Sequence, residues 1–294
     1  MKTIHVGKNC EYKTINSLIK ELNEPTLILL DDDNYYEKVV INKDNIIIDG
    51  QNKARIYYDD YAKKIHQDGR EYVTFRTYTM LVKSNNVTLK NLTIENTAGE
   101  GHVVGQAVAL HLYGTNIHVD NCNLLAKQDT LFCGPLSDDL IERYVDLLPD
   151  DERFFVGEFE HFFNNCTIVG TVDFIFGGAS ALFKDCTIVS LKTPSDSYIV
   201  APNHRKENKH GMIFEDCKII KDKNTKDESV FLARPWRDYG FVTFKNCYLD
   251  SHIKKEGFSI WQGTDRHLHA RFIEINSTGP GANNKKRVGW SKVC

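Results

Sequence analysis

The sequence lacks several features that would each point to a particular class of protein. It has no strong excess of charge, because 37 lysines and arginines are balanced by 40 aspartates and glutamates, for a net charge of −3. This composition argues against a nucleic-acid partner, which requires a basic surface. No apolar run approaches the length of a membrane span, and the first ten residues contain no apolar signal-peptide core. We therefore expect no membrane partner.

The 294 residues also contain no evident linker, so we expect one domain over residues 1–294, and a monomer. The chain itself predicts a cytoplasmic protein. If a targeting segment precedes it in a longer protein, the location would be extracellular.

Eight cysteines are present, but no two of them form a Cys-x-x-Cys pair, the usual spacing of a zinc site. Five of them follow an asparagine or aspartate in a recurring six-residue frame. Buried, reduced thiols explain this arrangement better than disulfides or a metal site does. We expect no metal and no cofactor.

The frame itself reads apolar, polar, Asn or Asp, Cys or Leu, any residue, Ile or Leu. It occurs at residues 89–94, 119–124, 163–168, 183–188, 214–219 and 244–249. Period-two alternation indicates strands, and Asn and Asp tolerate the left-handed conformation of a sharp bend. Unequal intervals between repeated strand corners are typical of a parallel β-helix, whose coils bury their faces only by stacking. The predicted fold is all-β, a right-handed parallel β-helix.

Two segments interrupt or close the repeat. Residues 14–22 have apolar side chains at helical spacing after Thr14, which predicts an N-capped helix covering the N-terminal end of the solenoid. Residues 134–157 form an acidic insertion between two unusual aspartates, Asp129 and Asp173. This insertion is expected near the active-site cleft.

Asp129 and Asp173 are predicted to lie in otherwise apolar strands, in Gln128-Asp129-Thr130-Leu131-Phe132 and Gly170-Thr171-Val172-Asp173-Phe174-Ile175-Phe176-Gly177. A buried carboxylate must be paired, hydrogen-bonded or protonated. The simpler explanation is that aspartate is common at bends. Together, however, the two aspartates suggest an acid and a nucleophile.

Three further residues strengthen that interpretation. Gln106 and Gln128 are neutral donors in apolar contexts, suited to an oxyanion, although an internal amide ladder is the alternative. Arg234, in Arg234-Pro235-Trp236, could hold a carboxylate ionised, although an exposed Arg-Trp pair is often only surface packing. An indole face such as that of Trp236 also suits a sugar ring.

These motifs resemble the pectinesterase (pectin methylesterase) family of carbohydrate esterases over nearly the whole chain. The supporting segments include residues 12–15, 35–41, 74–79, 96–99 and 106–110, besides the two aspartate motifs and Arg234-Pro235-Trp236. The resemblance implies hydrolysis of methyl esters in methylated galacturonan through an acyl-enzyme. The chain departs from the family pattern at Asp33, His111 and Ala233, none of which removes a catalytic group.

The resemblance also assigns roles to individual residues. It implies that Asp173 is the nucleophile, Asp129 the general acid and then base, and Arg234 the residue that orients Asp173. It further implies that Gln128 and Gln106 are oxyanion donors. The expected substrate contacts are Thr74, Trp236 and Phe176.

Other functions remain open at this point. A pectate lyase would need a calcium-binding acidic cluster with a basic residue, and a polygalacturonase would need two carboxylates flanking a glycosidic oxygen. Neither explains the two glutamines. A noncatalytic module would bind pectin without releasing methanol.

Overall fold

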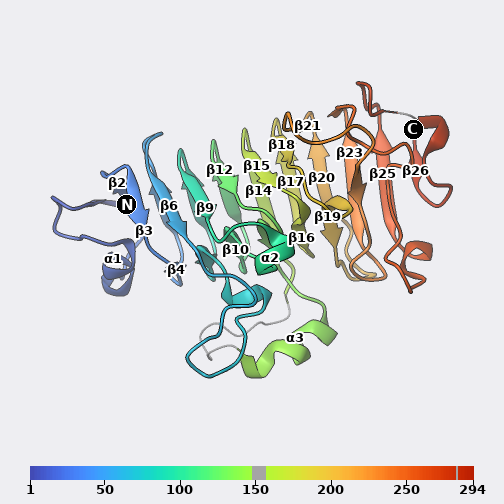
Figure 1. Ribbon diagram of the computed structural model, residues 1–294. Coiled ribbons are helices and arrows are strands. Elements are labelled where there is room, and N and C mark those ends of the chain that lie inside the picture. Colours follow the sequence, from blue (N-terminus) through green and yellow to red (C-terminus); the bar gives the residue numbers. More distant parts are fainter. Residues whose placement is uncertain (148–156, 283) are drawn as a thin grey trace.

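The computed structural model describes residues 1–147, 157–282 and 284–294. Within these residues the strands form three long sheets, here called A, B and C, and paired strands run parallel. Successive strands pass from sheet to sheet, so that each coil stacks on the one before it (Figure 1). The predicted stack of coils is therefore confirmed as a parallel β-helix.

Each sheet takes one strand from each of several successive coils. Sheet A contains β1 (Lys2–Val6), β2 (Thr26–Leu30), β5 (Ile46–Asp49), β8 (Val87–Lys90), β11 (Ile117–Asp120), β14 (Glu160–Asn164), β17 (Ser180–Lys184), β20 (Met212–Glu215), β23 (Phe241–Lys245), β25 (Arg271–Ile275) and β26 (Lys292–Val293). Sheet B contains β3 (Asn34–Tyr36), β6 (Arg55–Tyr58), β9 (Thr93–Asn96), β12 (Asn123–Leu125), β15 (Thr167–Gly170), β18 (Thr187–Ser190), β21 (Lys218–Lys221) and β24 (Tyr248–Leu249). Sheet C contains β4 (Val39–Ile41), β7 (Met80–Val82), β10 (Leu110–Leu112), β13 (Leu131–Cys133), β16 (Val172–Gly177), β19 (Ser197–Pro202) and β22 (Val230–Ala233).

Helices are few and lie outside the coils. They are α1 (Ile15–Glu21), α2 (Gly101–Val104) and α3 (Asp138–Tyr144), with short 3₁₀ turns at Thr74–Arg76, Val145–Leu147, Arg266–Leu268 and Asn284–Lys286. Among the described residues, none of the helices is long and apolar enough to cross a membrane.

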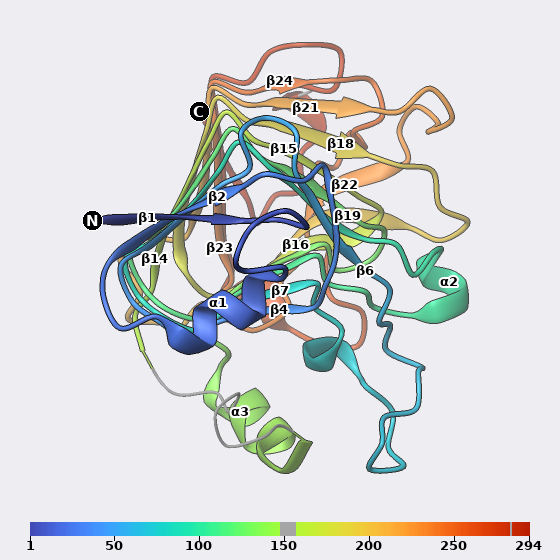
Figure 2. The same ribbon diagram turned by 90° about the vertical axis from the view of Figure 1, so that its left-hand side faces the viewer.

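Helix α1 covers the N-terminal end of the solenoid, as predicted (Figure 2). Its N-cap is Thr14, whose side chain accepts a hydrogen bond from the Ser17 amide. The Glu37 carboxylate accepts two more, from the amides of Ile15 and Asn16 at 2.9 and 2.8 Å. These acceptors satisfy helix N–H groups that have no partner within the helix.

The six recurring frames form the corners between sheets A and B, which confirms their interpretation as bends. The third residue of every frame has a positive φ, between 51° and 57°, at Asn91, Asn121, Asn165, Asp185, Asp216 and Asn246. The five frame cysteines are at most 1% exposed, and all eight cysteines are free thiols. Each frame thiol donates to a main-chain carbonyl of the preceding coil, for example Cys166 to Val119 at 3.1 Å. They behave as small buried hydrophobic residues with a satisfied donor.

The three sheets bury their residues in two different patterns. In sheets A and B, buried residues alternate with partly exposed ones, as in β11 and β15. Inside sheet A, four phenylalanines stack face to face at 4.4–4.8 Å, namely Phe163, Phe183, Phe214 and Phe244. In sheet C, by contrast, every residue of β7, β10, β13 and β19 is buried. Both faces of sheet C are therefore covered.

An aromatic layer covers the outer face of sheet C. His111, Phe132 and Phe176 lie level with one another on adjacent strands. Phe75, from the segment between β6 and β7, packs against all three rings at 5.1–6.4 Å. Tyr144 of α3 packs in turn against Phe75 at 4.9 Å. Figures 1 and 2 show α3 and the β6–β7 segment projecting from the same side of the solenoid.

Candidate active site

Asp129 and Asp173 lie close enough to interact electrostatically, and each precedes a ring of the aromatic layer, Phe132 or Phe176, by three residues. Asp173 is within β16, where its pairing with β19 shifts register between Val172 and Ile175. Asp129 is not inside a strand, contrary to the sequence-based expectation, because it lies in the bend that precedes β13. Gln128 and Gln106 likewise precede their strands. The left-handed φ of 63° at Asp129 bends the chain just before β13, as the φ of 48° at Asp173 interrupts β16 where its register with β19 shifts.

The two aspartates share their backbone conformation with the corner residues but not their surroundings. Asp173 has φ 48°, close to the 53° of Asp185 at a corner. Asp185 is exposed, whereas Asp129 and Asp173 are only 7% and 9% exposed. A tolerance for left-handed backbone therefore accounts for aspartate at all these positions. Burial is what distinguishes the pair.

Arg234, directly after β22, forms a bidentate ion pair with Asp173. Its Nε and Nη2 atoms lie 2.8 and 2.5 Å from the two carboxylate oxygens of Asp173. The guanidinium is held between two aromatic rings, with its carbon 3.8 Å from the centre of Tyr198 and 4.3 Å from that of Trp261. This geometry fixes both the charge and the orientation of the Asp173 carboxylate.

Neither Tyr198 nor Trp261 is among the site residues predicted from the sequence. Tyr198 looks like an ordinary residue of a buried strand, and Trp261 lies in an irregular segment without a motif. Only the stacking of coils brings both rings to Arg234. For Trp261, the one signal in the sequence was a large aromatic residue in a segment without strand or helix periodicity.

The two carboxyl groups differ in their expected protonation. Burial, followed by the nearby charge of Asp173, raises the pKa of Asp129 well above its ordinary value. Burial also raises the pKa of Asp173, but hydrogen bonds and charge from Arg234 oppose that rise. When the pair shares one proton, the proton therefore resides on Asp129 and the negative charge on Asp173. Because the groups interact strongly, they titrate as a pair.

The two glutamines reach the site from adjacent coils. The Gln128 side chain hydrogen-bonds to Asp129. A Cβ on Gly101, at the start of α2, would lie 2.8 Å from Gln128 Oε1, so glycine lets α2 pack directly against this side chain. The Gln128 carbonyl accepts from the Ala107 amide at 3.1 Å, which places Gln106 in the coil next to Gln128.

Two of the predicted substrate contacts, Phe176 and Trp236, pack against each other. Phe176 is 3% exposed and meets the half-buried Trp236 edge to face at 5.8 Å. Trp236 therefore presents the more accessible surface of the two, with Phe176 supporting it. Thr74, the third, lies in the turn that carries Phe75. Thr74 is linked to the segment that follows Gln106 through Thr77, whose hydroxyl donates to the Thr74 carbonyl and accepts from the Val108 amide.

The described part of the 134–157 insertion lies beside Trp236. Asp139, on α3, forms an ion pair with Arg237 at 2.8 Å. The guanidinium carbon of Arg237 lies 5.4 Å from the centre of the Trp236 ring. Asp138 pairs with Arg205. Residues 148–156 of this insertion lie outside the described residues. The described helix therefore borders the site at the edge that carries Trp236.

No group of three or more His, Cys, Asp or Glu side chains in the described residues is arranged to hold a metal ion. The fold and the site define the class of the protein: a parallel β-helix with two buried aspartates beside sheet C, one of which is bound by an arginine. The chain belongs to the pectinesterase family, whose sequence profile, described as Pectinesterase, matches residues 3–136 and 147–294.

Individual relatives support this membership. The chain is 28% identical over 298 residues to an Arabidopsis thaliana protein described as probable pectinesterase/pectinesterase inhibitor 21, covering 96% of this chain and 40% of that protein. It is 29% identical over 305 residues to a pectinesterase of Petunia integrifolia, covering 98% of this chain and 73% of that protein. The chain thus spans less than half the length of the first of these relatives.

A solved structure agrees with the fold. The chain superposes with a TM-score of 0.80 and 25% identity on a pectin methylesterase solved in complex with a hexasaccharide, covering 100% of this chain and 93% of that one. These comparisons confirm the resemblance to pectinesterases and the right-handed parallel β-helix.

Proposed function

We propose that this protein is a pectin methylesterase that hydrolyses methyl esters of methylated galacturonan or its oligomers and releases methanol. The observation that carries the proposal is the buried pair of Asp129 and Asp173, with Arg234 bound to one member only. Such an asymmetric pair supplies one anion and one proton at the same place. Membership of the pectinesterase family supports the same reaction.

In the proposed first step, a carboxylate oxygen of Asp173 attacks the ester carbonyl carbon. The tetrahedral intermediate collapses as protonated Asp129 gives its proton to the methoxy oxygen, so that methanol leaves and Asp173 becomes acylated. In the second step Asp129, now a carboxylate, takes a proton from water, which attacks the acyl group. The products are a free galacturonic acid and a regenerated Asp173 carboxylate.

The oxyanion of each tetrahedral intermediate needs donors that are already in place. Gln128, held against Asp129 and packed under α2, and Gln106 in the neighbouring coil are the proposed donors. Removing one donor of this kind typically lowers turnover by about 10²–10³-fold.

The proposed substrate is a chain of sugars that crosses sheet C. The pectin methylesterase solved with a hexasaccharide supports an oligosaccharide ligand for this fold. Trp236 offers an aromatic face beside the aspartates, and α3 borders it through Arg237. We propose that the 134–157 insertion walls one end of the cleft and favours short oligomers over long pectin.

The test is methanol release from highly methylated pectin and from methylated oligogalacturonides, with and without EDTA. Methanol without new reducing ends or unsaturated sugars is the expected result, unchanged by EDTA. New reducing ends would identify a polygalacturonase instead, and calcium-dependent unsaturated products would identify a lyase. Binding of pectin without methanol would identify a noncatalytic module.

A further inference from the structure

The segment between β6 and β7, which carries Thr74, contains a strained residue. Val73, directly before Thr74, has φ 49° and ψ −171°. A β-branched residue rarely adopts a positive φ, and such a conformation persists only when neighbouring contacts hold it. Something outside this turn must therefore fix the position of Thr74.

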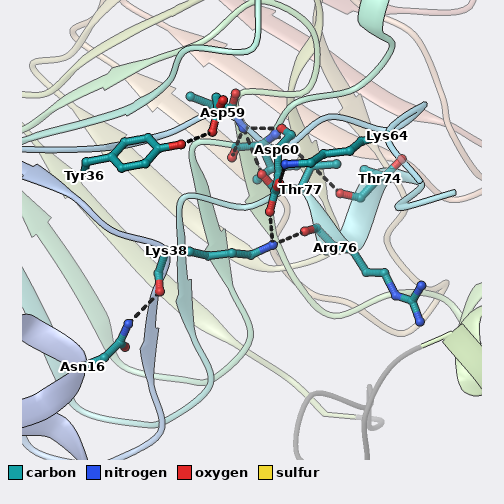
Figure 3. A network of polar contacts seen from close by, with 11 residues as sticks. Asn16, Tyr36, Lys38, Asp59, Asp60, Lys64, Thr74, Arg76 and Thr77 are labelled. Atoms are coloured by element: carbon teal, nitrogen blue, oxygen red, sulfur yellow. Dashed lines mark hydrogen bonds and ion pairs between the residues drawn. The ribbon is translucent and has the colours of Figure 1, made fainter. Parts of the chain in front are cut away.

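A buried carboxylate at the start of this segment is the centre of those contacts. Asp60 is 1% exposed, and its two oxygens lie 2.6 and 2.7 Å from the ammonium groups of Lys38 and Lys64. The Lys38 ammonium also donates to the Arg76 carbonyl at 2.5 Å (Figure 3). The Lys38 ammonium thus links the Asp60 carboxylate to the turn at residues 74–76.

Two buried side chains, those of Asn96 and Thr77, connect the turn to the segment that carries Gln106 and leads into β10. The side-chain Nδ2 of Asn96 donates to the carbonyls of Asp60, Thr77 and Val108 at 2.9, 2.9 and 3.2 Å. The Thr77 hydroxyl donates to the Thr74 carbonyl at 2.7 Å and accepts from the Val108 amide at 3.0 Å. Thr74 and residue 108 are therefore held by a single hydroxyl group.

A second link reaches Gln106 itself. Ala62, two residues after Asp60, donates its amide to the Gln106 carbonyl at 2.9 Å and accepts at its own carbonyl from the Val73 amide at 3.0 Å. The same short stretch of chain thus contacts both the strained residue before Thr74 and the proposed oxyanion donor. Movement of residues 60–62 would displace both.

We propose that Asp60 is a positioning residue for the esterase reaction, setting Thr74 and Gln106 together through Lys38, Lys64 and the backbone of residues 60–62. Asp60 touches no reacting atom, and it acts by neutralising two ammonium groups that otherwise repel each other in a largely buried place. The inference rests on the proposed esterase function. In this proposal, the geometry of the oxyanion donors depends on Asp60, which lies in a different coil from the proposed catalytic aspartates.

The primary test is Asp60→Asn, with Asp59→Asn as the matched control. Asp59 is the adjacent aspartate, and its contact is a hydrogen bond from the Tyr36 hydroxyl at 2.6 Å, outside the lysine pair. Asp60→Asn should lower kcat for methanol release by about tenfold to a hundredfold, since small displacements of aligned groups have effects of this size. Asp59→Asn should leave kcat within about twofold of the parent, because the half-buried Asp59 lies outside the ion pairs of Asp60 with Lys38 and Lys64.

A double-mutant cycle separates positioning from general loss of structure. If Asp60 acts through Gln106, then Asp60→Asn in a Gln106→Ala background should reduce kcat much less than it does in the parent. Equal, additive reductions in both backgrounds would overturn the proposal. All rates are referred to the folded fraction measured by circular dichroism.

Lys64 provides a milder variant in case Asp60→Asn fails to fold. Its side chain is 38% exposed, so Lys64→Met should fold while weakening one arm of the network. Lys64→Met should lower kcat severalfold and Lys64→Arg should restore it, since a guanidinium keeps the charge. Full activity in Lys64→Met and Asp60→Asn would refute the inference, whereas a parent protein that releases no methanol would refute the proposed function itself.

Discussion

Sheet C and the pair of sheets A and B are built from the same coils but expose different faces to solvent. In sheets A and B, the inward residues are buried and the outward ones are largely solvated, as in β11 and β15. In sheet C the outward residues are buried as well, beneath Phe75 and the ring of Tyr144. The aspartate pair lies at the margin of that covered face. A dehydrated surface is what allows neighbouring carboxyl groups to hold different protonation states.

The same contrast appears in residues of one conformation. Asp173 and Asp185 both adopt a positive φ, 48° and 53°, yet only Asp173 is buried and bound by arginine. The exposed residue makes a corner, and the buried one is proposed to perform chemistry. The left-handed backbone explains why aspartate occurs at both positions. The surroundings of each side chain determine the role of its carboxylate.

The largest expected effect separates these two aspartates. Asp173→Asn should reduce methanol release by at least about a thousandfold, because it removes the proposed nucleophile. The amide is nearly isosteric, so the fold should remain. Asp185→Asn, the matched control in the same conformation, should retain parental activity. Methanol release by both purified variants is the measurement, and a Asp173→Asn variant within a few-fold of the parent would exclude the nucleophilic role.

The next largest effect is expected at Gln128, which is compared with Asn123, another side-chain amide of the same coil. Gln128→Ala should lower kcat by about 10²–10³-fold through loss of an oxyanion donor, with a smaller change in KM. Asn123→Ala is the control, because Asn123 is an exposed amide on β12 of sheet B. Steady-state kinetics of the two variants test the difference. Similar, modest losses in both would indicate that Gln128 belongs to a structural amide ladder.

A substitution inside sheet A should lower the stability of the protein and leave its turnover unchanged. Phe183 lies in the phenylalanine stack, 4.4 Å from both Phe163 and Phe214 and fully buried. Phe183→Ala should reduce the free energy of unfolding by about 3–5 kcal/mol, the usual cost of removing a buried phenylalanine. Denaturant unfolding measures this loss. Turnover per folded molecule should stay at the parental level, and a fall in kcat would show that the scaffold and the site are coupled.

The smallest expected effect is a gain in stability at the site. The raised pKa of Asp129 means that, as pH rises above the ordinary carboxyl range, the unfolded chain releases a proton that the folded chain keeps. Stability from this group is therefore present in acid and is lost as pH rises through the folded pKa. Asp129→Asn removes this loss, so it should raise Tm at neutral pH by a few degrees at most.

The pH dependence checks the sign of this prediction. The Tm advantage of Asp129→Asn over the parent should shrink as the pH falls below the ordinary pKa of aspartate, where both states of the parent are protonated. Thermal unfolding of the two proteins across acid and neutral pH provides the comparison. A variant less stable than the parent at neutral pH would show that Asp129 is not held in an unfavourable, buried environment.

Much of the fold was predictable because its rules are local. Asn and Asp at the corners, alternation in the strands of sheets A and B, and Thr14 before α1 each express a preference of a few neighbouring residues. The sequence also indicated Asp129, Asp173 and Arg234 as a group, since charged residues in apolar surroundings are unusual. It misplaced Asp129, Gln128 and Gln106 within strands, because their apolar neighbours looked like extended structure, whereas all three residues lie in the irregular segments that precede β10 and β13.

The sequence by itself determined the coil, its corners and the chemical types available on one sheet. Only the tertiary structure decided that Tyr198 and Trp261 enclose Arg234, that Asp60 joins two distant segments, and that α3 borders Trp236. These contacts join residues from different coils. Because the coils differ in length, the sequence has no fixed period that would show which residues of one coil lie beside those of the next. Stacking sets that alignment through the burial of whole faces, which is a property of the folded chain and not of any short segment.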